Sequence, residues 1–136
     1  MPALEAAFRE QAAQVNGPYF VGGKSMGGRV ASMLAAEIGA EGFVCFGYPF
    51  HPPGKPERTR TEHLQQLQCR GMIVQGTRDP FGKPGEVAEY DLDQRLRLHW
   101  LESGEHDFKP LKSSGLTQQG LIEEAAAVAA TFMQEH

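Results

Sequence analysis

The stretch Tyr19-Phe20-Val21-Gly22-Gly23-Lys24-Ser25-Met26-Gly27-Gly28 decides the fold of this chain. A short apolar run leads into glycines and a serine, and a helical pattern begins directly after Ser25. This order is the context of a nucleophile elbow, which presents a serine hydroxyl on a strained turn above a sheet. Gly23 and Gly27 suit the elbow because larger side chains would collide where strand and helix meet. The amide of Met26, at the start of the helix, would then face an oxyanion above Ser25.

Other interpretations of the same glycines have to be weighed. A P-loop requires Gly, four residues and then Gly-Lys-Ser, and Pro18 occupies the position of the first glycine. A dinucleotide-binding G-x-G-x-x-G motif also fails, because Lys24 stands where the second glycine belongs. Ser25 as a plain turn residue or helix N-cap remains the alternative to a nucleophile.

Composition narrows the class of protein. The chain has 136 residues, which favours one domain, and 40% of them are hydrophobic, enough for a globular core. The net charge is −4 without a basic stripe, which argues against nucleic-acid binding. Two cysteines, Cys45 and Cys69, form no disulfide framework and suit a reduced, cytoplasmic protein. Neither a signal peptide nor an apolar run of the roughly 20 residues of a membrane span is visible.

Periodicity and turn residues predict strands alternating with helices, which is typical of a parallel α/β sheet. The predicted strands cover about 19–22, 43–46, 72–75 and 96–101, and the predicted helices cover 2–15, 26–38, 61–67, 85–90 and 117–134. Thr61 is the expected N-cap of the third helix. The apolar run 43–46 predicts a strand covered on both faces, whereas Arg97 and His99 predict a half-exposed last strand.

Polar side chains follow separate predicted strands: Ser25 the first, Asp79 the third and His106 the fourth. Parallel strands share one carboxyl edge, where α/β folds bind ligands, so these side chains are expected to meet there. The chain order serine, aspartate, histidine is that of α/β-hydrolase triads. In such a triad the imidazole takes the serine proton, and the carboxylate orients the ring and stabilises the imidazolium.

Four segments then carry a family resemblance: G-G-K-S-M-G-G-R-V-A-S, G-Y-P-F-H-P-P-G-K-P, Q-G-T-R-D-P-F-G and E-H-D-F-K-P. They resemble the dienelactone-hydrolase-like α/β-hydrolases. More narrowly, the chain is similar to the small bacterial relatives of the testis-expressed and non-specific-lethal complex subunit hydrolase-like proteins. The resemblance implies Ser25, Asp79 and His106 as the catalytic triad and the amide of Met26 as one oxyanion donor.

The same resemblance implies a departure from the family pattern. Members of this fold have further strands and a helix before the first helix seen here, so residues 1–136 correspond to a single, N-terminally shortened α/β-hydrolase-like domain of about four parallel strands. The strand at Tyr19 would become an exposed apolar edge, and we expect the chain to form a homo-oligomer, most simply a two-fold dimer, through it. The loop with the second oxyanion amide would be missing, which predicts feeble turnover.

The leading hypothesis is a serine hydrolase that acts on a small-molecule ester, thioester or lactone. Phe50 and His51, from the proline-rich loop, and Phe81 are the expected substrate-binding residues. No cofactor is expected, and no metal site, because the histidines lack a common ligand spacing. The alternative is a non-catalytic α/β-hydrolase-like module for protein contacts. Nucleotide binding by the glycine-rich turn is disfavoured by the motif spacing.

Overall fold

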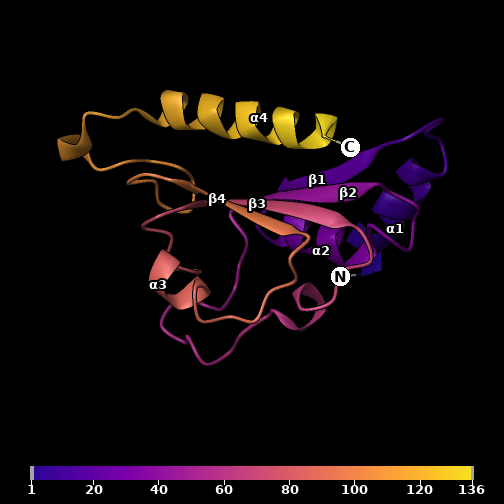
Figure 1. The fold of residues 1–136 in the computed structure, drawn as a ribbon, viewed down its shortest axis with the longest axis horizontal. Helices are drawn as coiled ribbons and strands as arrows, with labels where there is room; N and C mark the ends of the chain where they lie inside the picture. Colours follow the sequence, from indigo (N-terminus) through magenta and orange to yellow (C-terminus); the bar gives the residue numbers. More distant parts are fainter. Residues whose placement is uncertain (1, 136) are drawn as a thin grey trace.

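Four parallel strands form one sheet in the computed structural model, which describes residues 2–135 (Figure 1). The strands are β1 (Phe20–Lys24), β2 (Gly42–Phe46), β3 (Arg70–Gly76) and β4 (Leu96–Leu101), and their order in the sheet is β1-β2-β3-β4. The predicted parallel α/β architecture is therefore confirmed. All strands end at one edge, so the segments that follow them are delivered to the same side of the molecule.

Helices cover both faces of this sheet. α1 (Pro2–Ala12), α2 (Met26–Leu34) and α3 (Pro84–Val87) lie on one side, and α4 (Gln118–Gln134) lies on the other (Figure 1). Short 3₁₀ turns, η1 (Glu62–Leu64) and η2 (Lys112–Ser114), interrupt the loops. The prediction of a helix at 61–67 is therefore wrong: the segment forms a single 3₁₀ turn, and the Thr61 side chain makes no capping hydrogen bond.

The helix boundaries follow local chemistry. α1 ends at Ala12, short of the predicted position 15. The regular part of α2 ends at Leu34, but hydrogen bonds from Gly39 N to Ala36 O and from Ala40 N to Ala35 O close the following turns. Gly39 has φ +85°, so these bonds form a Schellman motif that ends the helical segment. Thr117 accepts a hydrogen bond from Gly120 N and is the N-cap of α4, which begins at Gln118.

The core lies in two layers, one on each face of the central strands. The α2 side is filled by Phe43, Cys45, Tyr48, Phe50, Leu64 and Ile73, among others. The α4 side is filled by Val44, Met72, Val74, Leu101, Leu121 and Phe132 with their neighbours. Successive residues of β2 alternate between the layers, which confirms that this strand is covered on both faces.

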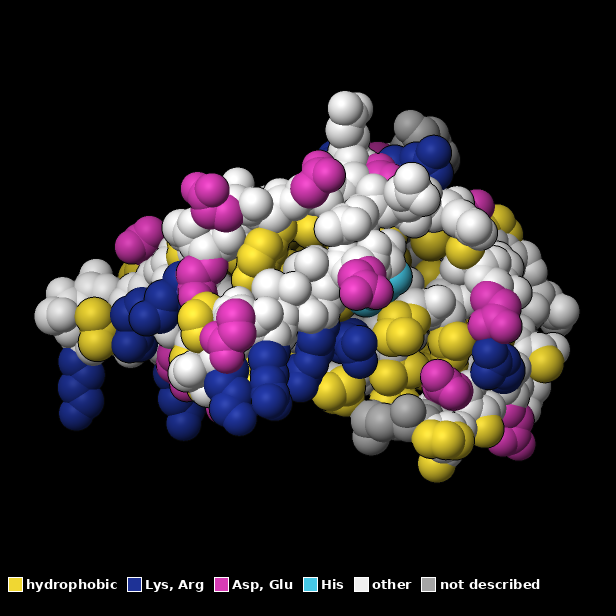
Figure 2. All heavy atoms as spheres, turned by 90° about the horizontal axis from the view of Figure 1, so that it is seen from below, with side chains coloured by type: hydrophobic (Ala, Val, Ile, Leu, Met, Phe, Trp, Pro, Cys, Tyr) yellow, Lys and Arg dark blue, Asp and Glu magenta, His cyan; other side chains and the backbone are white. Residues whose placement is uncertain are grey.

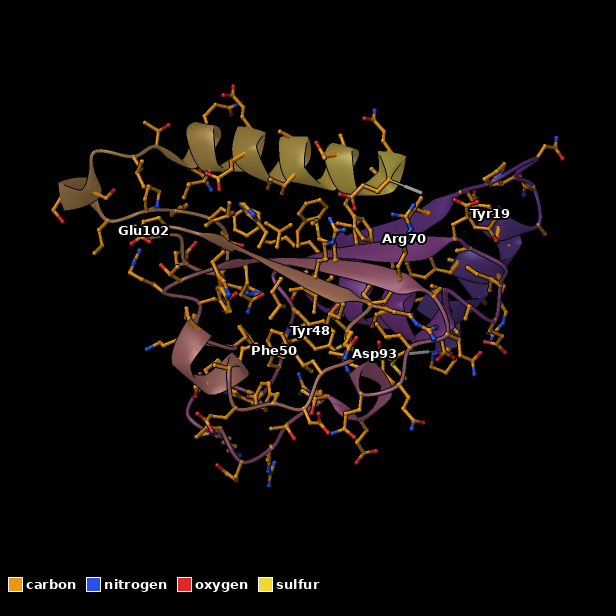
Figure 3. All side chains as sticks on the ribbon, in the orientation of Figure 1. Tyr19, Tyr48, Phe50, Arg70, Asp93 and Glu102 are labelled. Carbon is orange, nitrogen blue, oxygen red and sulfur yellow. The ribbon has the colours of Figure 1, made fainter. Side chains whose placement is uncertain are left out.

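Arg70, at the start of β3, fastens the end of α4 to the sheet. Its guanidinium donates hydrogen bonds to Phe132 O at 2.8 Å and to Glu135 O at 2.5 Å. It also lies 5.0 Å from the centroid of the Phe20 ring and 4.9 Å from that of Phe132 (Figure 3). A cation near the C-terminal end of a helix binds carbonyl groups that have no partner within the helix, and it interacts favourably with the negative end of the helix dipole.

β1 is one of the two outer strands of the sheet, with β4 at the other edge: within residues 2–135 it pairs with β2 alone. A groove of about 380 Å³ runs between α1 and this strand, lined by Leu4, Ala7, Phe8, Gln11, Ala12, Val15, Tyr19, Phe20 and Val21. Seen from the α3 side, hydrophobic side chains gather toward the end of the molecule where α1 lies (Figure 2). In the described part of the chain, no helix is long and apolar enough to cross a membrane.

Candidate active site

Ser25 occupies a strained turn between β1 and α2. Its φ of 54° and ψ of −121° lie outside the regions that a residue with a side chain usually adopts. The backbone is fixed on both sides, because Ser25 N donates to Phe46 O at 2.9 Å and Arg29 N donates to Ser25 O at 2.9 Å. The Ser25 side chain makes no capping hydrogen bond to α2. The alternative that this serine is only an N-cap is therefore not supported.

Two glycines let the strand and the helix approach at this turn. A Cβ on Gly23 would lie 2.9 Å from Gly27 C, and a Cβ on Gly28 would lie 2.2 Å from Cys45 Sγ. Nothing lies within 4 Å of the same position on Gly27. The prediction for Gly27 is therefore wrong, since Gly28 is the second residue of close approach. The Cys45 thiol beneath it is fully buried, and burial raises its pKa well above the usual value.

The structure brings Ser25, Asp79 and His106 together in one hydrogen-bonded chain. His106 Nε2 lies 3.0 Å from Ser25 Oγ, and His106 Nδ1 lies 2.8 Å from Asp79 Oδ2. An ionised carboxylate only accepts, so the ring proton sits on Nδ1 and donates to Asp79. Nε2 of the neutral ring is then free to accept the serine proton. Asp79 is fully buried, and its Oδ1 accepts a hydrogen bond from Phe81 N at 2.8 Å.

Close backbone approaches explain why three distant segments meet here. A Cβ on Gly76, at the end of β3, would lie 2.2 Å from Gly104 O in the segment after β4. A Cβ on Gly47, which follows β2 and has φ +75°, would lie 3.2 Å from His106 Cε1. Glycine at 76 therefore leaves room for the backbone that leads to His106, and glycine at 47 leaves room for the imidazole itself. Neither glycine could be assigned to the site from the sequence, because these contacts are long-range.

The predicted substrate-binding residues separate into two groups. The Phe81 ring lies against the His106 ring, with 4.4 Å between the centroids, and so borders the site. Phe50 is fully buried, packs against Tyr48 on the α3 side of the sheet (Figure 3), and presents no surface to a ligand. His51 is 2% exposed and donates its ring hydrogen bonds elsewhere, to Pro52 O and to the Glu86 carboxylate. The structure does not bring Phe50 or His51 to the serine.

The pKa of His51 reflects this separate environment. Burial lowers it, but the Pro52 carbonyl and the Glu86 carboxylate outweigh burial, so the pKa is raised from its usual value. The His51 ring therefore binds Pro52 and Glu86, and these contacts hold the proline-rich loop in place instead of serving the candidate site.

An ion pair links the residues that adjoin Ser25 and His106. Lys24 Nζ donates to Asp107 Oδ1, and this hydrogen bond lowers the pKa of the Asp107 carboxyl. The pair is about half exposed, so its contribution to stability is small. It forms one rim of a groove of about 590 Å³ whose other lining residues are Phe46, Phe108, Lys109, Gln118, Ile122, Ala125 and Ala126.

A second serine–histidine contact, between Ser32 and His63, lacks the features of a catalytic pair. Their Oγ and Nε2 atoms are 2.9 Å apart, but Ser32 Oγ donates its proton to Arg29 O at 2.6 Å. Tyr48 donates its own proton to Arg60 O, so His63 Nε2 can only be the donor to both hydroxyls. Burial and the nearby Arg29 charge lower the pKa of His63 to about 4. Nε2 of this ring is therefore not available as a base.

Gln75 is a residue of the site region that the sequence analysis did not single out. It is fully buried near the end of β3. Its Oε1 accepts from Tyr48 N at 2.7 Å, and its Nε2 donates to Tyr48 O at 3.1 Å and to Gly82 O at 3.2 Å. It thus joins the segment after β2 to the turn that carries Asp79. The available signal was a single amide side chain at the end of an otherwise apolar strand.

Comparison with known proteins identifies the family of this chain. Residues 1–134 match the family model described as an alpha/beta hydrolase domain. The chain belongs to the alpha/beta hydrolase family. This membership confirms the family resemblance at that level and supports a hydrolase; the narrower dienelactone-hydrolase-like branch stays a prediction.

Within residues 2–135 no group of histidine, cysteine, aspartate and glutamate residues could hold a metal ion.

Solved structures of other α/β hydrolases share the fold. An alpha-beta serine hydrolase homologue from Coxiella burnetii superposes with a TM-score of 0.65 at 16% identity, over 94% of this chain and 56% of that one. A protein from Xanthomonas campestris pv. campestris, described as a candidate hydrolase of the alpha/beta superfamily, gives a TM-score of 0.61 at 16% identity, over 96% of this chain and 69% of that one. A protein of unknown function from Agrobacterium tumefaciens, described as a candidate alpha/beta hydrolase, gives a TM-score of 0.58 at 18% identity, over 87% of this chain and 52% of that one.

These α/β hydrolases are longer than this chain, which spans 56% of the length of the Coxiella protein. At such low identity the likeness establishes the fold and not the reaction. The four-stranded parallel sheet corresponds to the C-terminal part of an α/β-hydrolase fold, as predicted.

Proposed function

We propose that this α/β hydrolase is a serine hydrolase that cleaves a small-molecule ester, thioester or lactone. The observation that carries the proposal is the continuous hydrogen-bonded chain from Asp79 through His106 to Ser25. These are the residue types, in the chain order and at the distances, that acyl transfer to a serine requires. Family membership supports the hydrolase class.

In the first half of the reaction, Ser25 Oγ attacks the substrate carbonyl carbon and passes its proton to His106 Nε2. The C–O bond to the serine forms, and the carbonyl electron pair moves onto oxygen. Buried Asp79 stabilises the imidazolium through Nδ1–H. When the tetrahedral intermediate collapses, the imidazolium returns the proton to the leaving alcohol or thiol, and an acyl-serine remains.

In the second half, water replaces the leaving group. His106 Nε2 removes a proton from the water as it attacks the acyl carbon, and the ring then returns that proton to Ser25 Oγ. The carboxylic acid leaves, and the hydrogen-bonded chain is restored. For a lactone, the leaving alcohol stays attached to the product.

The oxyanion is assigned to the amide of Met26, the first residue of α2. The first amides of a helix have no acceptor within the helix, and they lie at the positive end of its dipole. Loss of one oxyanion donor typically costs about 10²–10³ in rate. The Met26 amide is therefore expected to contribute a rate factor of this order.

A fluorophosphonate probe tests the proposal, because it phosphonylates only an activated serine. Intact-mass and peptide analysis of the labelled chain should show one adduct, on Ser25. Ser25→Ala and His106→Ala should abolish it. Ser32→Ala is the matched control: this serine is also on α2 and also contacts a histidine, yet its removal should leave the adduct unchanged.

Absence of an adduct on the folded wild-type chain would remove the support for covalent catalysis and favour the non-catalytic interaction module. An adduct that persists in His106→Ala would contradict the assignment of the base. The substrate class is then addressed with p-nitrophenyl esters, thioesters and lactones of increasing chain length, each measured against Ser25→Ala.

A further inference from the structure

We propose that Arg78 is a positioning residue that holds the His106 loop, residues 102–111, in the conformation that places the imidazole between Asp79 and Ser25. The inference rests on the proposed function for its catalytic consequence, but the geometry that carries it stands by itself. Arg78 directly precedes the carboxylate residue of the triad, and its side chain extends onto the loop that carries the base.

The His106 loop is strained on both sides of the histidine. Ser103 has φ 67° and Phe108 has φ 67°, and together with Ser25 these are the residues other than glycine with positive φ in the described chain. A residue with a side chain pays free energy to adopt this region, and it stays there only when surrounding contacts enforce it. Left to itself, the loop would relax at both positions, and the imidazole between them would move.

Arg78 contacts the loop at both strained points. Its Nε donates to the carbonyl of Ser103 at 2.7 Å, and its Nη2 donates to the carbonyl of Lys109, the residue after Phe108, at 3.0 Å. Its backbone N donates to Gly104 O at 2.9 Å. The guanidinium is planar and rigid, so two carbonyls bound to one fork are held at a fixed separation. This side chain therefore spans the segment that contains His106, in addition to the loop's own hydrogen bond from Glu105 N to Lys109 O at 3.0 Å.

The neighbouring residues strengthen this bracing. Thr77 Oγ1 accepts from Ser103 N at 2.8 Å, and Ser103 Oγ accepts from Leu111 N at 3.0 Å. Within the loop, Glu105 Oε1 accepts from Asp107 N at 2.7 Å. Among these contacts, only the Arg78 side chain reaches both ends of the loop from outside it. Because Arg78 is fixed to Asp79 by one peptide bond, it ties the position of the base to that of the carboxylate.

The test compares Arg78→Met, which keeps length and apolar volume, with Arg78→Lys and with a matched control, Arg95→Met. Arg95 Nη1 also donates to a loop carbonyl, Leu67 O at 2.8 Å, on a loop that does not carry the triad. The rate of Ser25 phosphonylation is measured at several probe concentrations. This separates the affinity of the noncovalent probe complex from the rate constant of phosphonylation within it. Thermal unfolding is recorded for each variant.

Arg78→Met should lower the rate constant about 10- to 100-fold with little change in probe affinity, since misplacing a catalytic group by about 1 Å costs on this order. Arg78→Lys should recover part of the rate, because an ammonium can hold one carbonyl but not both. Arg95→Met should label like the wild type. Arg78→Met labelling at the wild-type rate would overturn the proposal.

A second measurement does not depend on activity. The His106 Nδ1–H proton, held by Asp79, should give a downfield proton resonance in the wild type and in Arg95→Met and should broaden or disappear in Arg78→Met. An unchanged resonance in Arg78→Met refutes the positioning role even if no variant reacts with the probe. A wild type that shows this resonance but does not react refutes the proposed function and leaves the positioning role to be judged by the resonance.

Discussion

Asp79→Asn is the substitution whose outcome the geometry fixes most sharply. Asp79 Oδ1 accepts from Phe81 N at 2.8 Å, and Oδ2 accepts from His106 Nδ1 at 2.8 Å. In the variant, Phe81 N–H still requires an acceptor, so the new amide oxygen takes the Oδ1 position. The new NH₂ group must then face His106. Being a donor, it forces Nδ1 to accept, and the ring proton moves to Nε2. The base that faces Ser25 is lost while every side chain stays in place.

The expected loss is about 10³- to 10⁴-fold in the phosphonylation rate constant, or about 4 to 5.5 kcal/mol at 1.36 kcal/mol for each factor of ten. Stability should change little, because the volume is conserved and the Phe81 hydrogen bond survives. Rapid-quench labelling of Ser25 at pH 7 gives the rate constant, and thermal unfolding gives the stability.

Asp93→Asn is the control for this experiment. Asp93 also accepts two backbone hydrogen bonds, from Leu67 N and Arg95 N, both at 2.8 Å, but away from the triad. Its substitution should lower stability without slowing the labelling of Ser25. If Asp79→Asn reacts within threefold of the wild type, the tautomer argument is wrong and Asp79 does not orient the base.

Three further outcomes follow from the structure. Gln75→Leu leaves buried polar groups of Tyr48 and Gly82 unpaired and should lower the free energy of unfolding by about 3 to 6 kcal/mol in urea titrations. The pKa of His63 is lower in the folded chain, about 4, than in the unfolded chain, so its contribution to stability is complete above about pH 6.5 and is lost as the pH falls toward 4. The urea midpoints of the wild type and His63→Gln at pH 7 and pH 5 measure that loss. Equal pH dependence of the two midpoints would contradict it. We propose that the open edge of β1 pairs with a second copy of the chain, so light scattering after size exclusion should show a dimer at micromolar concentration; a monomer at that concentration would contradict it.

Local chemistry was enough to predict the elements. The apolar run 43–46 and the alternation at 96–101 each predict a strand, because side chains along a strand alternate between its two faces with a period of two. The same reasoning failed at 61–67 and at Phe50. There, a proline-rich loop is held by distant partners, and a large aromatic side chain in a loop was taken for a pocket wall when it is a core residue.

The sequence by itself determined that a serine, an aspartate and a histidine follow different parallel strands, and hence that they share one edge of the sheet. Only the tertiary structure decided that Gly28 and not Gly27 meets Cys45, that Gly47 makes room for the imidazole, and that Arg78 closes the loop around His106. The physical reason is the range of the interactions. The periodicity of a strand or a helix is visible in the order of neighbouring residues. Close packing and buried hydrogen bonds join residues that lie tens of positions apart, and such pairs produce no periodic pattern in the sequence.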